Sequence, residues 1–183
     1  QGKIHIVEPD LDAFVRSAVS NGMLEAYVEP QEGDIYMICV PTPFHETPGV
    51  PTPNIDYVIN AAESISKYIK PNDLVILEST SPVGTTEKIQ SVFINEGVDV
   101  QKVHIAYCPE RVLPGKIMTE LVENDRIVGG LTAVATKEVA DFYRTFVRGE
   151  VLETSAKTAE MCKLAENSFR DVNIAFANEL SVI

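Results

Sequence analysis

The chain has 183 residues, 45% of them hydrophobic, which is enough for one packed domain and part of a second but not for a complete two-domain enzyme. Lys and Arg number 15 against 27 Asp and Glu, a formal net charge of −12, so neither a nucleic acid nor an anionic membrane is expected as a partner. Any anionic ligand must therefore be held by a few local cations. The longest apolar run is far too short for a membrane span, which predicts a soluble chain.

Cysteine usage and the two chain ends give further expectations. Cys39, Cys108 and Cys162 show neither CxxC nor Cys/His ligand spacing, and no secretory segment precedes them. We expect a reducing, cytoplasmic setting and no structural zinc or other metal site. The sequence begins at Gln1 and stops at Ile183 inside an apolar helical pattern without a stop signal, so we expect both ends to continue in a longer protein.

The first third of the chain changes from helical to strand periodicity. An acidic turn at 7–10 is expected to open a short helix that carries Leu11, Phe14, Val15 and Ala18. Residues 34–40, DIYMICV, are nearly all apolar, which predicts a strand covered on both faces. A proline-rich loop at 44–54 is predicted to be irregular and rigid, and a helix is expected over 55–69.

The alternation of strands and helices continues to the end of the chain. Strands are predicted at 73–78, 103–107, 126–128 and 150–153, and helices at 85–95, shortly after 115, at 136–147 and from 156 onward. Such alternation predicts an α/β fold with a doubly wound, Rossmann-like sheet. We expect residues 1–155 to form most of one domain and residues 156–183 to begin a second, helical one.

Three strand ends carry unusual turns: Val40 to Pro43, Glu78 to Gly84, and Cys108 to Arg111. Ligands of doubly wound sheets bind outside the carboxyl ends of the strands, so all three turns should line one edge. Thr42 and Thr80 fit simple turn chemistry or capping as well as ligand contact, but two such turns on one edge favour a dinucleotide.

The usual dinucleotide fingerprint is nevertheless missing. No two of the ten glycines are spaced i,i+2, so this chain has no G-x-G-x-x-G phosphate loop. If the fold binds a dinucleotide, we expect the first strand and its glycine-rich turn to lie upstream of Gln1.

The last 28 residues read as one long helix with two different faces. Lys163, Asn167 and Arg170 fall in one row at about 100° per residue. An apolar stripe lies on the opposite side and is expected to dock the helix onto a core. The polar row fits a solvated face or a site for an anionic or polyhydroxy ligand. The members of the apolar stripe are Met161, Ala165, Phe169, Val172, Phe176 and Ile183.

Six segments together resemble the UDP-glucose/GDP-mannose dehydrogenase family across essentially the whole chain and in the same order. They are GKIHIVEPDLD, ICVPTPF, VILESTSPVGTTEK, AYCPERVLPGK, NDRIVGG and AEMCKLAENSFRDVNIAFANEL. The last four are most similar to the branch that oxidises UDP-N-acetyl-D-mannosamine. The resemblance implies oxidation of C6 of a nucleotide sugar, from alcohol through aldehyde to carboxylate, with two NAD⁺ consumed for cell-surface polysaccharide synthesis.

The resemblance also implies roles for individual residues. Thr42 and Thr80 match residues that contact NAD, and Thr80 also sits where a catalytic water is held. Arg111 and Val112 match the segment that contacts the sugar nucleotide. Lys163 matches the catalytic lysine, and the substrate ligands beside it are Asn167 and Arg170.

Elementary chemistry agrees with these roles. Removal of hydride from C6 builds alkoxide-like charge, which the ammonium of Lys163 and the carboxamide of Asn167 can stabilise. Arg170, one turn further, can meet a phosphate or a carboxylate product. Glu110 can orient or deprotonate the water that hydrolyses a thioester, or it can simply be a surface or capping carboxylate.

Two departures from the family pattern limit the transfer of roles. Many members carry a second Glu where this chain has Pro114, so Glu110 cannot be assumed to act in a carboxylate pair. The nucleophilic Cys of the family lies downstream of the long helix, and none of the three cysteines inherits its role. Cys39 is expected to be a small buried residue within a strand, and His45 is expected to be a surface loop residue.

Three functional hypotheses remain open. The first is the central part of an NAD-dependent UDP-N-acetylmannosamine 6-dehydrogenase, and the second is the same chemistry on UDP-N-acetylglucosamine or UDP-glucose. The third is a non-catalytic module, because the chain alone lacks a phosphate loop and a nucleophile. In the family, helices of this type pair across a two-fold axis, so the resemblance implies a homodimer.

Overall fold

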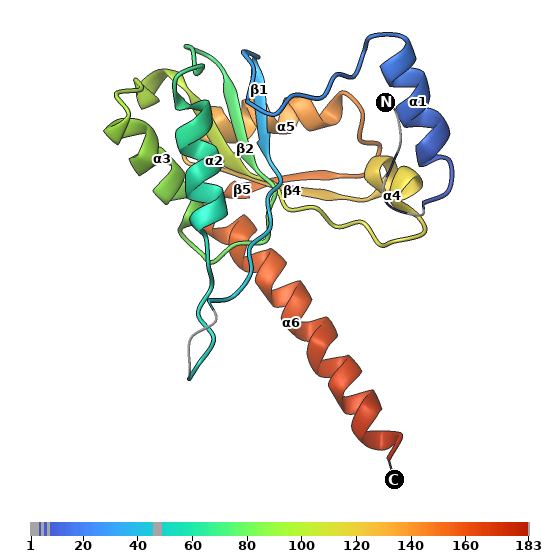
Figure 1. Ribbon diagram of the computed structural model, residues 1–183. Helices are drawn as coiled ribbons and strands as arrows, with labels where there is room; N and C mark the ends of the chain where they lie inside the picture. Colours follow the sequence, from blue (N-terminus) through green and yellow to red (C-terminus); the bar gives the residue numbers. More distant parts are fainter. Residues whose placement is uncertain (1–3, 5, 7, 46–48, 183) are drawn as a thin grey trace.

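The structure, a computed structural model, describes residues 4, 6, 8–45 and 49–182. Val7, Pro48 and Ile183, which entered the predictions above, lie outside the described residues. Figure 1 shows a central sheet with helices on both of its faces and a long helix that leaves the sheet and ends far from it.

A five-stranded sheet forms the centre of the fold. Its spatial order follows the sequence: β1 (Ile35–Ile38), β2 (Leu74–Leu77), β3 (His104–Tyr107), β4 (Arg126–Gly130) and β5 (Val151–Ser155). The first three strands are parallel, β4 runs antiparallel to β3, and β5 runs parallel to β4. The predicted α/β, Rossmann-like fold is confirmed, whereas the reversal of direction between β3 and β4 was not predicted.

Helices cover both faces of the sheet. The helices are α1 (Leu11–Ser20), α2 (Asp56–Ser66), α3 (Thr85–Asn95), α4 (Ile117–Glu123), α5 (Ala133–Arg144) and α6 (Ala156–Leu180), with a short 3-10 helix at Val100–Lys102. α2, α3 and the start of α6 cover one face of the sheet, and α5 covers the other. Among the described residues, no helix is both long enough and apolar enough to cross a membrane.

α5 begins three residues earlier than predicted. Thr132 caps it, because its hydroxyl oxygen accepts a hydrogen bond from the backbone N–H of Ala135 over 3.0 Å. β4 extends through Gly129 and Gly130, two residues beyond the predicted end of the strand at residue 128.

The prediction that β1 is covered on both faces is wrong. Tyr36 and Ile38 are buried under α2, but the alternate residues Ile35 and Met37 are 39% and 43% exposed. They share a face with Ile76, which packs under α5. α5 lies mainly over β3, β4 and β5 and contacts β2 less, so within the described residues this edge strand is well covered on one face only.

The prediction that the apolar stripe of α6 docks onto the core is also wrong within this chain. Met161, Phe169, Val172 and Phe176 are all more than half exposed, and Ala165 is exposed. The face that packs against the sheet carries Ala156, Ala159 and Glu160 instead. Small side chains let the helix lie close to the strands. Lys163 of the polar row bonds the loop after β3, whereas most of the apolar stripe faces away from the domain.

Candidate functional site

The carboxyl ends of β1, β2 and β3 meet at one edge of the sheet because these strands are parallel. Two hydroxyl groups tie the loops after β1 and β2 together there. Thr42 Oγ1 donates to the backbone oxygen of Thr80 over 2.6 Å, and Ser79 Oγ donates to the backbone oxygen of Val40 over 2.7 Å. The predicted convergence of the loops is therefore confirmed.

A hollow of about 280 Å³ opens at these strand ends, and we call it the strand-end hollow. It is lined by Cys39, Val40, Glu78, Ser79, Thr80 and Glu110. Thr42 is not among the lining residues, and its hydroxyl group donates to the backbone oxygen of Thr80. Among the residues that the structure describes, two carboxylates and no cation line the hollow, so it fits hydroxyl donors and a cationic ring better than phosphates.

Glu78 accepts hydrogen bonds from two side chains, one on each carboxylate oxygen. Tyr143 Oη donates to Glu78 Oε1 over 2.6 Å, and Cys39 Sγ donates to Glu78 Oε2 over 3.2 Å. Partial burial of the sulfur and the negative charge of Glu78 raise the pKa of the Cys39 thiol to about 12, so the group stays protonated as a donor. The expectation of a buried cysteine within a strand is wrong, because Cys39 follows β1 and is exposed as a residue.

Glu110 is anchored through a single carboxylate oxygen. Its Oε1 accepts from the backbone N–H groups of Arg111 and Val112 over 2.6 and 3.1 Å. Arg126 Nη1 is the third donor, at 3.1 Å, and this arginine side chain is 1% exposed. The antiparallel register between β3 and β4 brings Arg126 to this edge. Oε2 has no hydrogen-bond partner within the residues that the structure describes.

A second, larger cavity lies between the loop after β3 and α6, and we call it the α6 cavity. It measures about 550 Å³ and is lined by Arg111, Val112, Leu113, Pro114, Lys163, Glu166, Asn167, Phe169 and Arg170. Lys163 Nζ donates to the backbone oxygen of Glu110 over 2.7 Å. Glu110 thus stands between the two cavities, with its carboxylate in the strand-end hollow and its carbonyl oxygen bonded to Lys163.

The charges in the α6 cavity are unbalanced toward positive. Arg111, Lys163 and Arg170 face a single carboxylate, Glu166. Arg111 Nη2 pairs with Glu166 Oε1 at 2.6 Å, and Arg170 Nη2 donates to Asn167 Oδ1 over 3.0 Å. Burial lowers the pKa of the Lys163 ammonium, with Arg170 acting in the same direction and Glu166 against it. The cavity therefore concentrates cations on an otherwise acidic chain.

The predicted site residues thus fall into two adjacent groups. Arg111, Val112, Lys163, Asn167 and Arg170 share the α6 cavity, and Thr80 lines the strand-end hollow with Glu110. Sequence reasoning missed Glu166 and Arg126. The position of Glu166, three residues after Lys163 on the same helix, could have indicated it. Arg126 gave no signal, because its place depends on the unpredicted antiparallel pairing.

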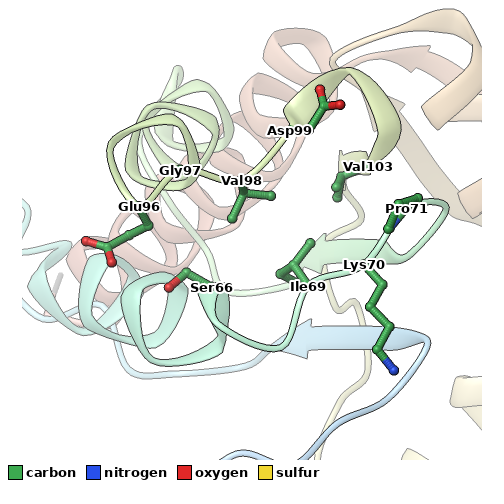
Figure 2. Close-up of a pocket in the computed structure, with 9 residues that line it drawn as sticks. All are labelled: Ser66, Ile69, Lys70, Pro71, Glu96, Gly97, Val98, Asp99 and Val103. Carbon is green, nitrogen blue, oxygen red and sulfur yellow. The ribbon is translucent and has the colours of Figure 1, made fainter.

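A third hollow, of about 230 Å³, lies at the opposite, amino-terminal edge of the sheet (Figure 2). Two of its three charged side chains have other partners: Lys70 pairs with Glu32, and Asp99 pairs with Lys102 and caps the backbone N–H of Gln101. Figure 2 shows the side chains of Lys70 and Glu96 pointing in different directions rather than toward a common point. We assign no ligand to this hollow.

A Rossmann-like sheet with a polar hollow at its strand ends and an adjoining cationic cavity is the arrangement expected of a dinucleotide-dependent class of protein. Residues 1–147 match the model of the UDP-glucose/GDP-mannose dehydrogenase family, NAD binding domain. Residues 157–183 match the central domain of the same family. The chain belongs to the UDP-glucose/GDP-mannose dehydrogenase family.

Two curated relatives are equally similar over the whole chain. The UDP-N-acetyl-D-mannosamine dehydrogenase of Escherichia coli K12 is 52% identical over 100% of this chain and 45% of that protein. The NDP-N-acetyl-D-galactosaminuronic acid dehydrogenase of Ralstonia nicotianae is also 52% identical, with the same coverage of both chains. The chain spans less than half the length of these relatives.

A solved structure agrees with the fold. The UDP-N-acetyl-mannosamine dehydrogenase of Staphylococcus aureus superposes with a TM-score of 0.89 at 42% sequence identity. The superposition covers 98% of this chain and 44% of that one.

Proposed function

We propose that the protein containing this chain is an NAD-dependent UDP-N-acetylmannosamine 6-dehydrogenase. It oxidises C6 of the nucleotide sugar to a carboxylate in two hydride transfers, and the product enters cell-surface polysaccharide synthesis. The observation that carries the proposal is the meeting of the α6 cavity and the strand-end hollow at Glu110. The names of the relatives at 52% identity support the substrate class.

The α6 cavity is proposed to hold the nucleotide sugar. Guanidinium groups bind phosphate oxygens through two parallel donors, and Arg170 is exposed at the far end of the cavity from Glu110. Arg111 is already paired with Glu166, so it offers fewer free donors. Val112 lines the same wall and supplies apolar contact to the sugar.

Lys163 and Asn167 are proposed to act on C6. Lys163 Nζ uses one of its three donors on Glu110, and the other donors remain for a substrate oxygen. An ammonium here stabilises the alkoxide-like charge that develops when C6 loses hydride, and its lowered pKa eases exchange of a proton with the substrate hydroxyl. Asn167 Oδ1 accepts from Arg170 Nη2, which leaves the amide N–H groups of Asn167 for the substrate.

The strand-end hollow is proposed to hold the nicotinamide end of NAD. When bound, NAD accepts the hydride that leaves C6. Glu78 and the backbone groups of Thr80 offer acceptors for ribose hydroxyls, and the two carboxylates favour the positive charge of an oxidised nicotinamide ring. Thr42 supports Thr80 from behind, so its proposed contact with NAD is indirect or through its methyl group.

Glu110 is proposed to handle the water of the hydrolytic step. Its Oε1 accepts from three donors, which leaves Oε2 to accept from a water that Thr80 would hold in the strand-end hollow, since both residues line it. Pro114 lines the other cavity and supplies no second carboxylate. Glu110 therefore acts as a single, rigidly oriented acceptor.

The exposed apolar stripe of α6 is proposed to pair with a second copy across a two-fold axis and form a homodimer. Val172 and Phe176 are exposed on a helix that leaves the sheet, which favours their burial in a partner rather than in this domain. The proposal also includes the division of the chain into two domains, residues 1–155 and residues 156–183. The free thiols of all three cysteines suit the reducing cytoplasm.

The test is the oxidation of purified nucleotide sugars by the protein that contains this chain, with NADH counted per sugar. UDP-N-acetylmannosamine should yield two NADH, and no NADH from this substrate would refute the proposal. The Ralstonia relative supports a second candidate substrate, a nucleoside-diphosphate N-acetylgalactosamine-type sugar. Direct competition with that sugar, UDP-N-acetylglucosamine and UDP-glucose separates the candidates. The isolated 183-residue chain should produce no NADH.

A further inference from the structure

We propose that Glu160 is a positioning residue that fixes α6, and with it Lys163, against the loop bordering the strand-end hollow. The proposal rests on the proposed function, because it takes Lys163 to be catalytic. Glu160 itself lines neither cavity.

Glu160 is a fully buried carboxylate with three donors. Its Oε2 accepts from the backbone N–H of Gly84 over 2.6 Å. Its Oε1 accepts from the backbone N–H of Thr86 over 2.8 Å and from Thr86 Oγ1 over 2.7 Å. The side chain is 0% exposed, and none of these partners is a cation. The first turn of α3 therefore balances its charge through N–H groups and the helix dipole.

These bonds hold the loop that leads into the strand-end hollow. Gly84 closes the segment that begins at Ser79 and Thr80, and its φ of 94° is a left-handed conformation that a glycine adopts without strain. Thr80 is in turn held by Thr42. A change at Glu160 thus acts on the wall of the hollow through a short stretch of backbone.

About one turn after Glu160, α6 also contacts Glu110, which lines another part of the strand-end hollow. Lys163 lies three residues after Glu160, about 4.5 Å further along the axis, on the same face. Its Nζ bonds the backbone oxygen of Glu110. The first turns of α6 therefore bind two loops. Glu160 contacts the loop after β2, and Lys163 contacts the loop after β3.

Close packing at Gly129 of β4 restricts movement of the junction between β5 and α6. A Cβ on Gly129 would lie 2.2 Å from the backbone oxygen of Ser155 and 2.8 Å from the backbone nitrogen of Ala156. The start of α6 thus touches the strand backbone directly. This packing fixes the position of α6 on the sheet, and the Glu160 contacts fix the rotation of α6 about its own axis.

The chain offers a matched control between the same two helices. Lys157 Nζ pairs with Glu87 Oε1 at 2.9 Å, and both side chains are more than half exposed. This pair joins α6 to α3 but touches neither cavity. Lys157→Met should therefore leave both the helix position and the rate unchanged.

The experiment compares Glu160→Gln, Glu160→Asp, Thr86→Val and Lys157→Met in the protein that contains this chain. The carboxamide of Glu160→Gln turns an NH₂ toward a donor and breaks at least one bond, and Thr86→Val removes only the hydroxyl donor. We expect kcat, measured below the melting temperature, to fall about 100-fold in Glu160→Gln and less in Thr86→Val, with KM for the sugar little changed. Glu160→Asp keeps the charge but has a side chain shorter by one methylene group. Its kcat should therefore lie between those of Glu160→Gln and Thr86→Val.

A second readout does not depend on activity. Amide hydrogen exchange in 80–86 and 160–167 should accelerate in Glu160→Gln and not in Lys157→Met, with exchange in β3 unchanged. Unchanged exchange in those segments overturns the inference even when the wild type is active. Faster exchange with an unchanged kcat shows a merely structural role and also overturns it. A wild type that oxidises no nucleotide sugar refutes the proposed function instead, and the exchange measurement still decides whether Glu160 holds the helix.

Discussion

Lys163 on α6 donates a hydrogen bond to the backbone oxygen of Glu110, the residue that separates the two cavities, over 2.7 Å. The sheet explains how residues 53 positions apart come together. Gly130 pairs with both Ala106 and Ser155, so β5 ends level with the middle of β3. α6 then turns back toward the carboxyl edge, and two helical turns reach the level of Glu110.

The first prediction concerns the proposed catalytic cation. In the protein that contains this chain, Lys163→Met should lower kcat for sugar oxidation about 1000-fold, because the alkoxide-like charge at C6 loses its nearest cation. NADH formation under saturating sugar and NAD⁺ measures the effect. Lys157→Met, on the exposed side of α6, is the control and should keep the wild-type rate. Equal rates for Lys163→Met and the wild type would remove Lys163 from the mechanism.

The second prediction concerns the buried partner of Glu110. Arg126→Met should lower the free energy of unfolding by about 2 kcal/mol, because it leaves a carboxylate that is only one-third exposed without its cation. Urea denaturation measures the change. In a double-mutant cycle with Glu110→Gln, the double variant should lose less free energy of unfolding than the sum of the two single losses. The coupling energy should be about 1 kcal/mol. Strict additivity would contradict the pairing.

The third prediction concerns the seat of α6 on β4. Gly129→Ala should destabilise the fold by about 2 to 3 kcal/mol, because its Cβ would meet the backbone at 2.2 Å and only a backbone shift relieves the contact. Gly33→Ala is the matched control, since its nearest neighbour beyond the adjacent residues is 4.0 Å away. Thermal melts of the two variants compare them directly. A Gly129→Ala melt at the wild-type temperature would show that α6 can move off the strand.

The fourth prediction concerns pH. The pKa of Cys39 is raised from 9.0 to about 12, so the folded protein holds the proton more tightly than the unfolded chain. The resulting stabilisation is complete below about pH 9 and is lost as the pH rises toward 12. Iodoacetamide should therefore alkylate Cys39 at pH 8 at less than about one-tenth of the rate of a free cysteine. Glu78→Gln should accelerate the reaction, and rapid alkylation of the wild type at pH 8 would contradict the account.

Local sequence patterns predicted the elements well where one signal dominated. The helix at 85–95 has the predicted bounds, because Pro82 and Gly84 mark its start and the glycine at 97 follows its end. The strand-end turns were also placed on one edge correctly. Parallel strands separated by helices leave little choice of topology for β1, β2 and β3.

The errors came from tertiary relationships that periodicity does not carry. The apolar stripe of α6 reads like a core-facing stripe, but the face with Ala159 and Glu160 packs more closely on the sheet. The role of Arg126 depends on the antiparallel register of β4, which no local pattern signals. Glu160 reads as an ordinary helical charge until its partners, 74 and 76 positions earlier, are known.

The central claim is that the α6 cavity binds a nucleotide sugar, and titration calorimetry with UDP-N-acetylmannosamine tests it most directly. Arg170→Met should weaken binding by about 10-fold or more, because the phosphate oxygens lose a charge-assisted donor. Arg148→Met removes an exposed arginine that pairs with Glu123 outside the cavity, and it should leave the affinity unchanged. Equal affinities for the wild type and both variants would show that the nucleotide sugar binds elsewhere and would contradict the account.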